Sequence, residues 1–145
     1  MSLVVLLSGP NLNLLGQREP EIYGTATLDE HVATFTQILN QFGHEVRHTQ
    51  SNFEGDLVEA VQEARRDAGA LVINPGALTH YSWSLHDALA SFDGPIIEVH
   101  LSNPALREPF RHQSVVAPVA LGTIAGFAGR SYLFAAHAVV TVLAG

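Results

Sequence analysis

The end of one apolar stretch of the sequence carries side chains suited to proton transfer. Glu98 and His100 stand two residues apart at the end of the run that begins at Pro95, so on a strand both side chains project from the same face. A carboxylate beside an imidazole usually orients the ring and fixes its tautomer. With Ser102 two residues further on, this group predicts a general acid or base, while the alternative is a structural histidine at a strand end.

A second pair of residues that could take part in catalysis lies near the start of the chain. Arg18 and Tyr23 are five residues apart within residues 9–25, a stretch rich in Gly, Pro and Asn that predicts a long functional loop. A guanidinium close to a phenol favours the tyrosinate anion, so the pair could supply a base near neutral pH. The alternative is that Tyr23 is an amphipathic packing residue.

Further polar side chains follow apolar runs elsewhere in the sequence. Arg107 and Arg111 are four residues apart, so on a helix they would share a face and could recognise an anion or a hydroxyl group. The alternative is a solvated pair or a subunit contact. Asn11, Asn74 and Ser102 are candidates for the same site, although Asn and Ser are also common turn residues.

The elements that must position these residues alternate between strands and helices. This alternation predicts a doubly wound, flavodoxin-like α/β fold with a five-stranded parallel sheet in the order 2-1-3-4-5, in one domain over residues 1–145. Ligands of such sheets bind beyond the carboxyl ends of the strands, so the loops after strands one, three and four should face one crevice. The expected strands are Leu3 to Leu7, Glu45 to Gln50, Ala70 to Ile73, Pro95 to Val99 and Val119 to Ile124. The expected helices run from the Thr27 capping box to Gly43, Asp56 to Asp67, Ser82 to Ser91 and Ser131 to Leu143, with a short turn at Arg107 to Phe110.

Composition excludes several classes of protein. The formal net charge of −7 argues against binding to a nucleic-acid backbone, and no apolar run reaches the ~20 residues of a membrane span. The chain has no cysteine and no lysine, since all seven basic residues are arginines. Disulfides, thiolate nucleophiles and a lysine imine are therefore ruled out, and the lack of cysteine fits a cytoplasmic location.

Two rival kinds of site find little support. The loop after the first strand, Gly9 to Gly16, matches neither the dinucleotide fingerprint nor a P-loop. Eight histidines suggest a metal, but none falls in a His-Glu-x-x-His motif and no carboxylate cluster joins them. We therefore expect neither a nucleotide cofactor nor a metal.

Three long motifs in this sequence resemble those of type II 3-dehydroquinate dehydratases, and together they are highly specific. The resemblance covers nearly the whole chain in order. The motifs run from Gly9 to Gly24, from Asn74 to His80, and from Glu98 to Asn103 followed by Arg107 to His112, with Ala117-Pro118 and Gly122 to Gly126 resembling the end of the family domain.

The resemblance implies a dehydration of 3-dehydroquinate to 3-dehydroshikimate through an enolate. Tyr23, as a tyrosinate supported by Arg18, would remove the proton α to the ketone. Asn11 would hold the water that stabilises the enolate. His100, oriented by Glu98, would protonate the departing hydroxyl. The unrelated type I enzymes use a lysine imine, a route that is closed to a chain without lysine.

The resemblance also implies which residues bind the substrate and how the chains assemble. Members of the family are cofactor-free dodecamers, built as tetramers of trimers, that serve shikimate biosynthesis, and so aromatic amino acid biosynthesis, or quinate breakdown. Arg107 would support the lid or loop, and Asp87 would reach a neighbouring subunit's site. The backbone of Leu101 and the hydroxyl of Ser102 would bind the carboxylate, with Asn74, His80 and Arg111 on the ring hydroxyls.

Some positions depart from the family pattern, and other functions stay open. A different lyase or isomerase could use the same Tyr and His, and a non-catalytic binding module would need neither. None of the departures falls on an implied catalytic residue; they affect the expected subunit contacts and loop packing. They are Tyr81, Trp83, His86, Ala105 and Gln113.

Overall fold

The fold is organised around a sheet of five parallel strands. The computed structural model describes residues 1–145, and its sheet has the order β2-β1-β3-β4-β5. This confirms the predicted flavodoxin-like topology. The strands are β1 (Leu3–Ser8), β2 (Glu45–Gln50), β3 (Ala70–Asn74), β4 (Ile96–His100) and β5 (Gly122–Ala125).

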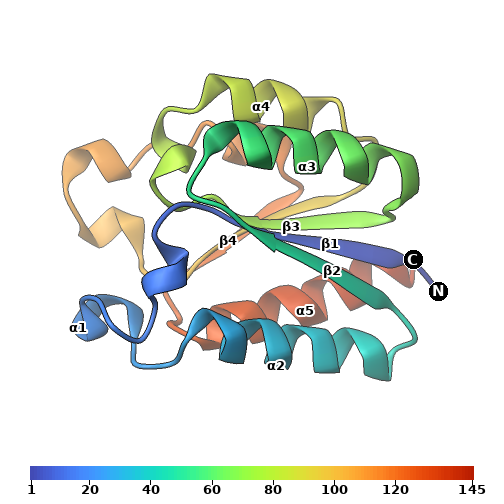
Figure 1. The fold of residues 1–145 in the computed structure, drawn as a ribbon, viewed down its shortest axis with the longest axis horizontal. Helices are drawn as coiled ribbons and strands as arrows, with labels where there is room; N and C mark the ends of the chain where they lie inside the picture. Colours follow the sequence, from blue (N-terminus) through green and yellow to red (C-terminus); the bar gives the residue numbers. More distant parts are fainter.

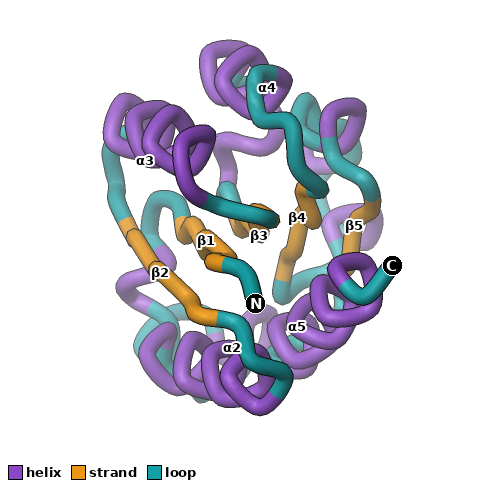
Figure 2. Tube along the Cα trace, turned by 90° about the vertical axis from the view of Figure 1, so that its right-hand side faces the viewer, coloured by secondary structure: helices purple, strands orange, loops and turns teal.

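Helices cover both faces of this sheet, as Figure 1 shows. Helices α2 and α5 lie together on one face, and α3 and α4 lie on the other. The tube in Figure 2 shows the same three layers along the strand direction. Both termini lie at the edge opposite the loops that follow the carboxyl ends of the strands. The helices are α1 (Pro20–Tyr23), α2 (Leu28–Gln41), α3 (Glu54–Asp67), α4 (Trp83–Ala90) and α5 (Arg130–Leu143).

Local sequence explains where the helices begin and which face they bury. The Thr27 hydroxyl accepts a hydrogen bond from the Glu30 amide at 3.2 Å, which confirms the predicted capping box at the start of α2. Phe35 and Leu39, four residues apart, are then fully buried against the sheet. Because β1 and β3 are covered on both faces, their continuous apolar runs are buried, except for the half-buried Leu3 at the start of β1.

Successive residues of β4 contribute to the cores on opposite sides of the sheet. Ile97 and Val99 belong to the core beneath α2 and α5, whereas Ile96 belongs to the core beneath α3 and α4. Side chains alternate along a strand, so Glu98 and His100 lie on the α3/α4 side. The sheet therefore carries both candidate proton-transfer groups to one face of β4.

Helix α3 begins at Glu54, two residues earlier than predicted, and two larger differences from the predicted elements each have a local reason. Residues 9–25 were expected as one irregular loop, but they contain a 3₁₀ turn at Leu12–Leu14 and the short helix α1, which begins at Pro20. Proline has its φ preset for a first helical turn. Strand β5 begins at Gly122 instead of Val119, because Ala117–Val119 form a 3₁₀ turn that contains Pro118.

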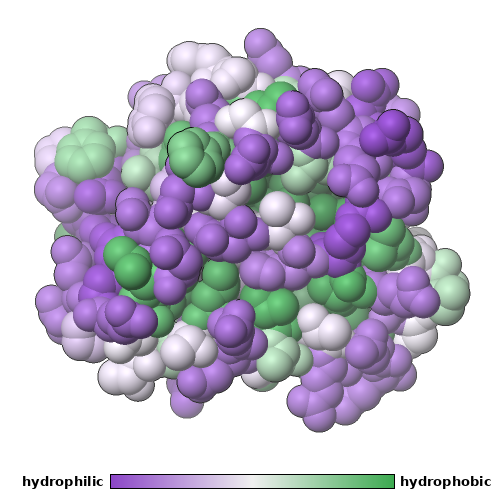
Figure 3. All heavy atoms as spheres, viewed as in Figure 1, coloured by the Kyte–Doolittle hydropathy of each residue, from purple (hydrophilic) through white to green (hydrophobic).

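Several large apolar side chains remain exposed on the single chain. Trp83 is 59% exposed, and Leu106, Phe110 and Leu121 are at least 60% exposed. The face in Figure 3 is mostly hydrophilic, with hydrophobic atoms visible between the two helix layers. Apolar side chains that form a contiguous exposed patch mark a surface that contacts other molecules, whereas single exposed ones do not.

Candidate active site

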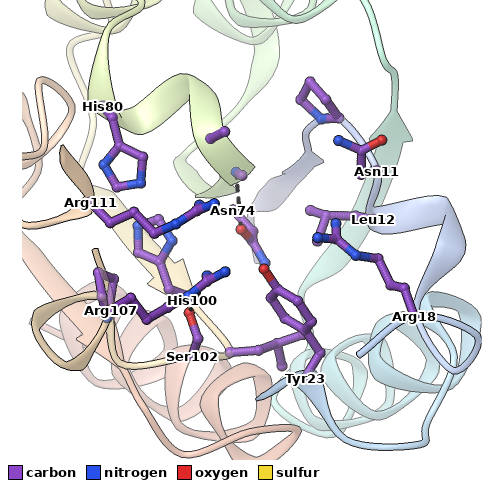
Figure 4. Close-up of a pocket in the computed structure, with 15 residues that line it drawn as sticks. Asn11, Leu12, Arg18, Tyr23, Asn74, His80, His100, Ser102, Arg107 and Arg111 are labelled. Carbon is purple, nitrogen blue, oxygen red and sulfur yellow. Dashed lines mark hydrogen bonds between the residues drawn. The ribbon is translucent and has the colours of Figure 1, made fainter. Parts of the chain in front are cut away.

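One pocket lies beyond the carboxyl ends of β1, β3 and β4, where the fold predicts a ligand site. Figure 4 shows its side chains converging from the three loops that follow these strands. Ten of the predicted site residues line it, namely Asn11, Arg18, Tyr23, Asn74, His80, His100, Leu101, Ser102, Arg107 and Arg111.

The loops after β1 and β3 come into close contact behind the pocket, and glycine makes this possible. A Cβ atom on Gly9 would collide with the Pro75 carbonyl group. Gly76 has a φ of +61°, and a Cβ there would lie 3.1 Å from the carbonyl oxygen of Pro10. The lack of a side chain at Gly9 and Gly76 thus allows the segments that carry Asn11 and Asn74 to lie side by side.

Asn11 occupies a left-handed backbone conformation, with φ of 69°. Asparagine tolerates this region better than most residues, and its amide N–H donates to the Asn52 side-chain oxygen at 2.9 Å. The Gln50 side chain donates to the Gly9 carbonyl at 3.2 Å. Residues at and just beyond the end of β2 therefore support the loop that presents Asn11, a role that the sequence reasoning missed.

Tyr23 lies between two guanidinium groups. The Arg18 Cζ atom is 4.7 Å from the centroid of the Tyr23 ring, and the Arg107 Cζ atom is 5.4 Å from it. Cations over an aromatic face are attracted to the ring. The structure brings the predicted Arg18–Tyr23 pair together and adds Arg107 as a second cation.

Glu98 and His100 form a buried pair at the end of β4. His100 Nε2 lies 2.6 Å from Glu98 Oε2, and Glu98 is fully buried. Since Nε2 faces the carboxylate, Nδ1 is the nitrogen left for the pocket that His100 lines. The carboxylate orients the imidazole, and a carboxylate–imidazole pair of this kind is suited to proton transfer.

The charge of Glu98 is maintained by hydrogen bonds from several side chains. Burial alone would raise the pKa of Glu98, but hydrogen bonding and charge from His100, with hydrogen bonds from Thr79 and Ser114, bring it below its usual value. Thr123, which pairs in register with Glu98 on β5, adds a longer contact at 3.3 Å. The carboxylate thus stays ionised although it is buried.

His80 faces the same pocket from the loop after β3. Its Nδ1 lies 2.7 Å from the carbonyl oxygen of Gln113, so Nδ1 carries the proton. Partial burial lowers the pKa of His80, and the neighbouring His100 and Arg111 lower it further, although the contact with Gln113 raises it. His80 is therefore neutral near neutral pH, and its Nε2 can accept a hydrogen bond from a ligand hydroxyl.

Asn74 is buried with its amide orientation defined at both ends. Its nitrogen donates to the Tyr132 hydroxyl at 3.2 Å, and its oxygen accepts from the Gly76 amide at 3.2 Å. Tyr132 is fully buried in α5. It was not a sequence candidate, because only the tertiary fold brings residues 74 and 132 together.

The two arginines of the third motif stand on separate turns. Arg107 ends the 3₁₀ turn Pro104–Leu106, whereas Arg111 belongs to Pro109–Arg111, so the prediction of one shared helical face was wrong. Pro109 starts a new turn between them. Arg107 Nη1 donates to the Ser102 hydroxyl at 3.2 Å, and Arg111 pairs with Glu108 at 3.1 Å.

Two predicted residues do not line the pocket, and one of them is Glu98, which is buried and contacts the pocket residue His100. Asp87 is exposed on α4 and does not line the pocket of its own chain, so its expected contact with a neighbouring subunit's site stays a prediction. No three His, Cys, Asp or Glu side chains gather as a metal-binding group. No helix has both the length and the apolar character needed to span a membrane.

Comparison with known proteins relates this pocket to one family. The model of a family described as dehydroquinase class II matches residues 2–140. The 3-dehydroquinate dehydratase of Dictyoglomus turgidum is 55% identical over 136 residues, covering 94% of each chain. That of Roseiflexus castenholzii is 54% identical over 132 residues, covering 91% of this chain and 84% of the relative. The crystal structure of the type II dehydroquinase from Propionibacterium acnes superposes with a TM-score of 0.92 at 40% identity, covering 97% of each chain.

Proposed function

The chain belongs to the class II dehydroquinase family, and from this premise we propose that Tyr23 and His100 carry out its reaction through an enolate. The reaction is the dehydration of 3-dehydroquinate, a hydro-lyase step of the shikimate pathway. The observation that carries the proposal is that both residues face one pocket, each beside the charged partner that its role requires.

Tyr23 acts as the base in this proposal. Its tyrosinate, flanked by Arg18 and Arg107, takes the proton from the carbon α to the ketone. The electron pair of the broken C–H bond moves into the carbonyl group and forms the enolate. A negative charge that develops in the transition state needs donors placed beforehand, and a water held by Asn11 supplies one.

His100 acts as the acid. The β-hydroxyl is a poor leaving group, so it departs as water once the imidazolium donates its proton. The enolate electron pair returns to form the conjugated C=C bond, and the ketone is restored. Glu98, ionised and 2.6 Å from the ring, stabilises the imidazolium before the transfer.

The remaining pocket residues hold the substrate. The Leu101 backbone and the Ser102 hydroxyl bind the carboxylate, and Arg107 supports Ser102 at 3.2 Å as part of the loop or lid. Asn74, His80 and Arg111 contact the ring hydroxyls. Donors and acceptors from three loops line the pocket, which supports binding of a polyhydroxylated acid.

The proposal extends to the whole chain and its assembly. Residues 1–145 act as one catalytic domain, since both cores pack against the one sheet. We expect a dodecamer built as a tetramer of trimers, in which exposed side chains such as Trp83 and Leu121 are covered and Asp87 reaches a neighbouring site. A cytoplasmic location suits a shikimate-pathway enzyme.

Ultraviolet absorbance after protein is added to 3-dehydroquinate tests the function, because the product is a conjugated enone. We expect absorbance to rise at the same rate with a chelator present and after borohydride treatment. A loss in chelator would point to a metal, and a loss after borohydride would point to a covalent imine. No rise from folded, assembled protein would contradict the dehydratase proposal.

A further inference from the structure

Two hydroxyl groups outside the proposed catalytic set converge on the buried Glu98 carboxylate. The Thr79 hydroxyl donates to Glu98 Oε2 at 2.6 Å, and the Ser114 hydroxyl lies 2.9 Å from the same oxygen and 3.1 Å from Oε1. The two hydroxyl oxygens are 2.8 Å apart. Thr79 precedes α4 and Ser114 follows β4, so two separate segments of the chain supply hydrogen bonds to the carboxylate.

The available hydrogen atoms leave these hydroxyls little freedom. The Ser114 oxygen accepts from the amides of Val116 and Ala117 at 3.1 and 2.9 Å, which occupies its lone pairs. Its hydrogen must therefore point to Glu98 or to Thr79. In either case the Thr79 hydroxyl donates its hydrogen bond to Glu98 Oε2. The two hydroxyls therefore always offer at least one donor to the carboxylate.

The same two segments also hold the second imidazole of the pocket. The Val115 amide donates to the Thr79 carbonyl at 2.7 Å, while His80 Nδ1, one residue after Thr79, contacts the carbonyl of Gln113, one residue before Ser114. The contacts on Thr79 and Ser114 therefore lie between those that orient His80 and those that orient His100.

We propose that Thr79 and Ser114 are positioning residues that form a hydroxyl clasp, which holds Glu98 and sets the protonated nitrogen of both His100 and His80. The role of the clasp in turnover rests on the proposed dehydratase function. The existence of the clasp rests only on the contacts of Thr79 and Ser114 with Glu98. Its chemistry is electrostatic, since a buried carboxylate that lacks donors loses its charge. A neutral Glu98 would no longer stabilise the imidazolium of His100.

The test replaces the Thr79 hydroxyl with a methyl group and keeps the shape of the side chain. Thr79→Val replaces only the hydroxyl of a residue that is 1% exposed. The other groups that contact the carboxylate, His100, Ser114 and Thr123, remain, as does the nearby His80. Thr141→Val is the matched control. It also removes one threonine hydrogen bond, the one that the Thr141 hydroxyl donates to the His137 carbonyl at 2.9 Å within α5.

We expect Thr79→Val to lower kcat about tenfold with little change in KM, whereas Thr141→Val keeps both. Removing this donor should raise the pKa of Glu98 by about one unit, since a hydrogen bond to a charged group shifts a pKa by about that much. The loss of kcat on the acid limb that follows protonation of Glu98 should therefore begin at a higher pH. Thr79→Ser restores the hydroxyl and should restore both values. Ser114→Ala should shift the same limb in the same direction.

A spectroscopic measurement separates the clasp from the function. The ¹⁵N chemical shifts of labelled imidazoles report which nitrogen carries the proton, with or without turnover. We expect neutral His80 to be protonated at Nδ1 and neutral His100 at Nε2 in the unchanged protein, and this pattern to be lost in Thr79→Val. A Thr79→Val protein with an unchanged acid limb and unchanged imidazole shifts would overturn the proposal, whether or not the unchanged protein turns over 3-dehydroquinate.

Discussion

Arg18 places its guanidinium carbon 4.7 Å from the ring centroid of Tyr23, although the two residues are five positions apart on either side of the start of α1. The contact forms because Pro20 starts a short helix that turns the chain back toward the pocket. Arg107 approaches the same ring from the loop after β4. Two guanidinium groups, from different loops, therefore lie close to this one phenol ring.

Replacement of Tyr23 by Phe tests the proposed base. The ring and its contacts with both arginines remain, while the hydroxyl that accepts the proton is lost. We expect kcat to fall by about 10³-fold, within the usual range for general base catalysis, with assembly unchanged in size-exclusion chromatography. Tyr81→Phe, which removes an exposed hydroxyl outside the pocket, is the control. Near-normal kcat in Tyr23→Phe would contradict the tyrosinate role.

Replacement of Arg18 by Gln should weaken the base without removing it. Arg107 still lies 5.4 Å from the ring, so we expect kcat to fall by only about 10- to 100-fold, less than in Tyr23→Phe. Arg66→Gln, in α3 away from the pocket, should leave the rate unchanged. If Arg18→Gln raised KM alone, Arg18 would be a substrate-binding residue instead.

Replacement of His100 by Ala should abolish turnover, because the hydroxyl would then leave without a proton. We expect a loss of at least about 10²-fold in kcat, measured by the absorbance assay, with an unchanged oligomer. His137→Ala, on the exposed side of α5, serves as the control. A variant that turned over at the normal rate would show that another group acts as the acid.

His31 should make stability depend on pH. It is 6% exposed, stacks on Tyr132 at 5.3 Å, and its Nε2 atom has no hydrogen-bond partner. Burial lowers the pKa of His31, against a smaller opposite effect of Glu30. The unfolded chain therefore binds the proton more readily, so stability is present above the unfolded value of about 6.5 and is lost as the pH falls.

His31→Phe keeps a stacked ring and removes the titration. We expect its Tm to change less than that of the unchanged protein between about pH 7.5 and about pH 5.5. The measurement is thermal unfolding at several pH values, with His137→Gln as the control for an exposed histidine. Parallel Tm curves for His31→Phe and the unchanged protein would assign the pH dependence to other groups.

Local sequence patterns predicted the topology of the sheet and most of the residues that line the pocket. The alternation of apolar runs with amphipathic segments predicted the parallel sheet and its order, because only a few topologies satisfy the rules for right-handed crossovers. The same rules put the carboxyl ends of β1, β3 and β4 at one edge, where ten predicted residues line the pocket. The spacing of Glu98 and His100 predicted their contact, since strand side chains two apart share a face.

The tertiary structure alone decided how these groups are supported. Thr79, Ser114 and Tyr132 carry no distinctive pattern in the sequence, yet they hold Glu98 and Asn74 through bonds that span 16 to 58 positions. Local propensity also could not tell that Arg107 and Arg111 stand on separate turns. Sequence periodicity reports which face a residue occupies, whereas a hydrogen-bond partner is set by loops that meet only after the sheet has formed.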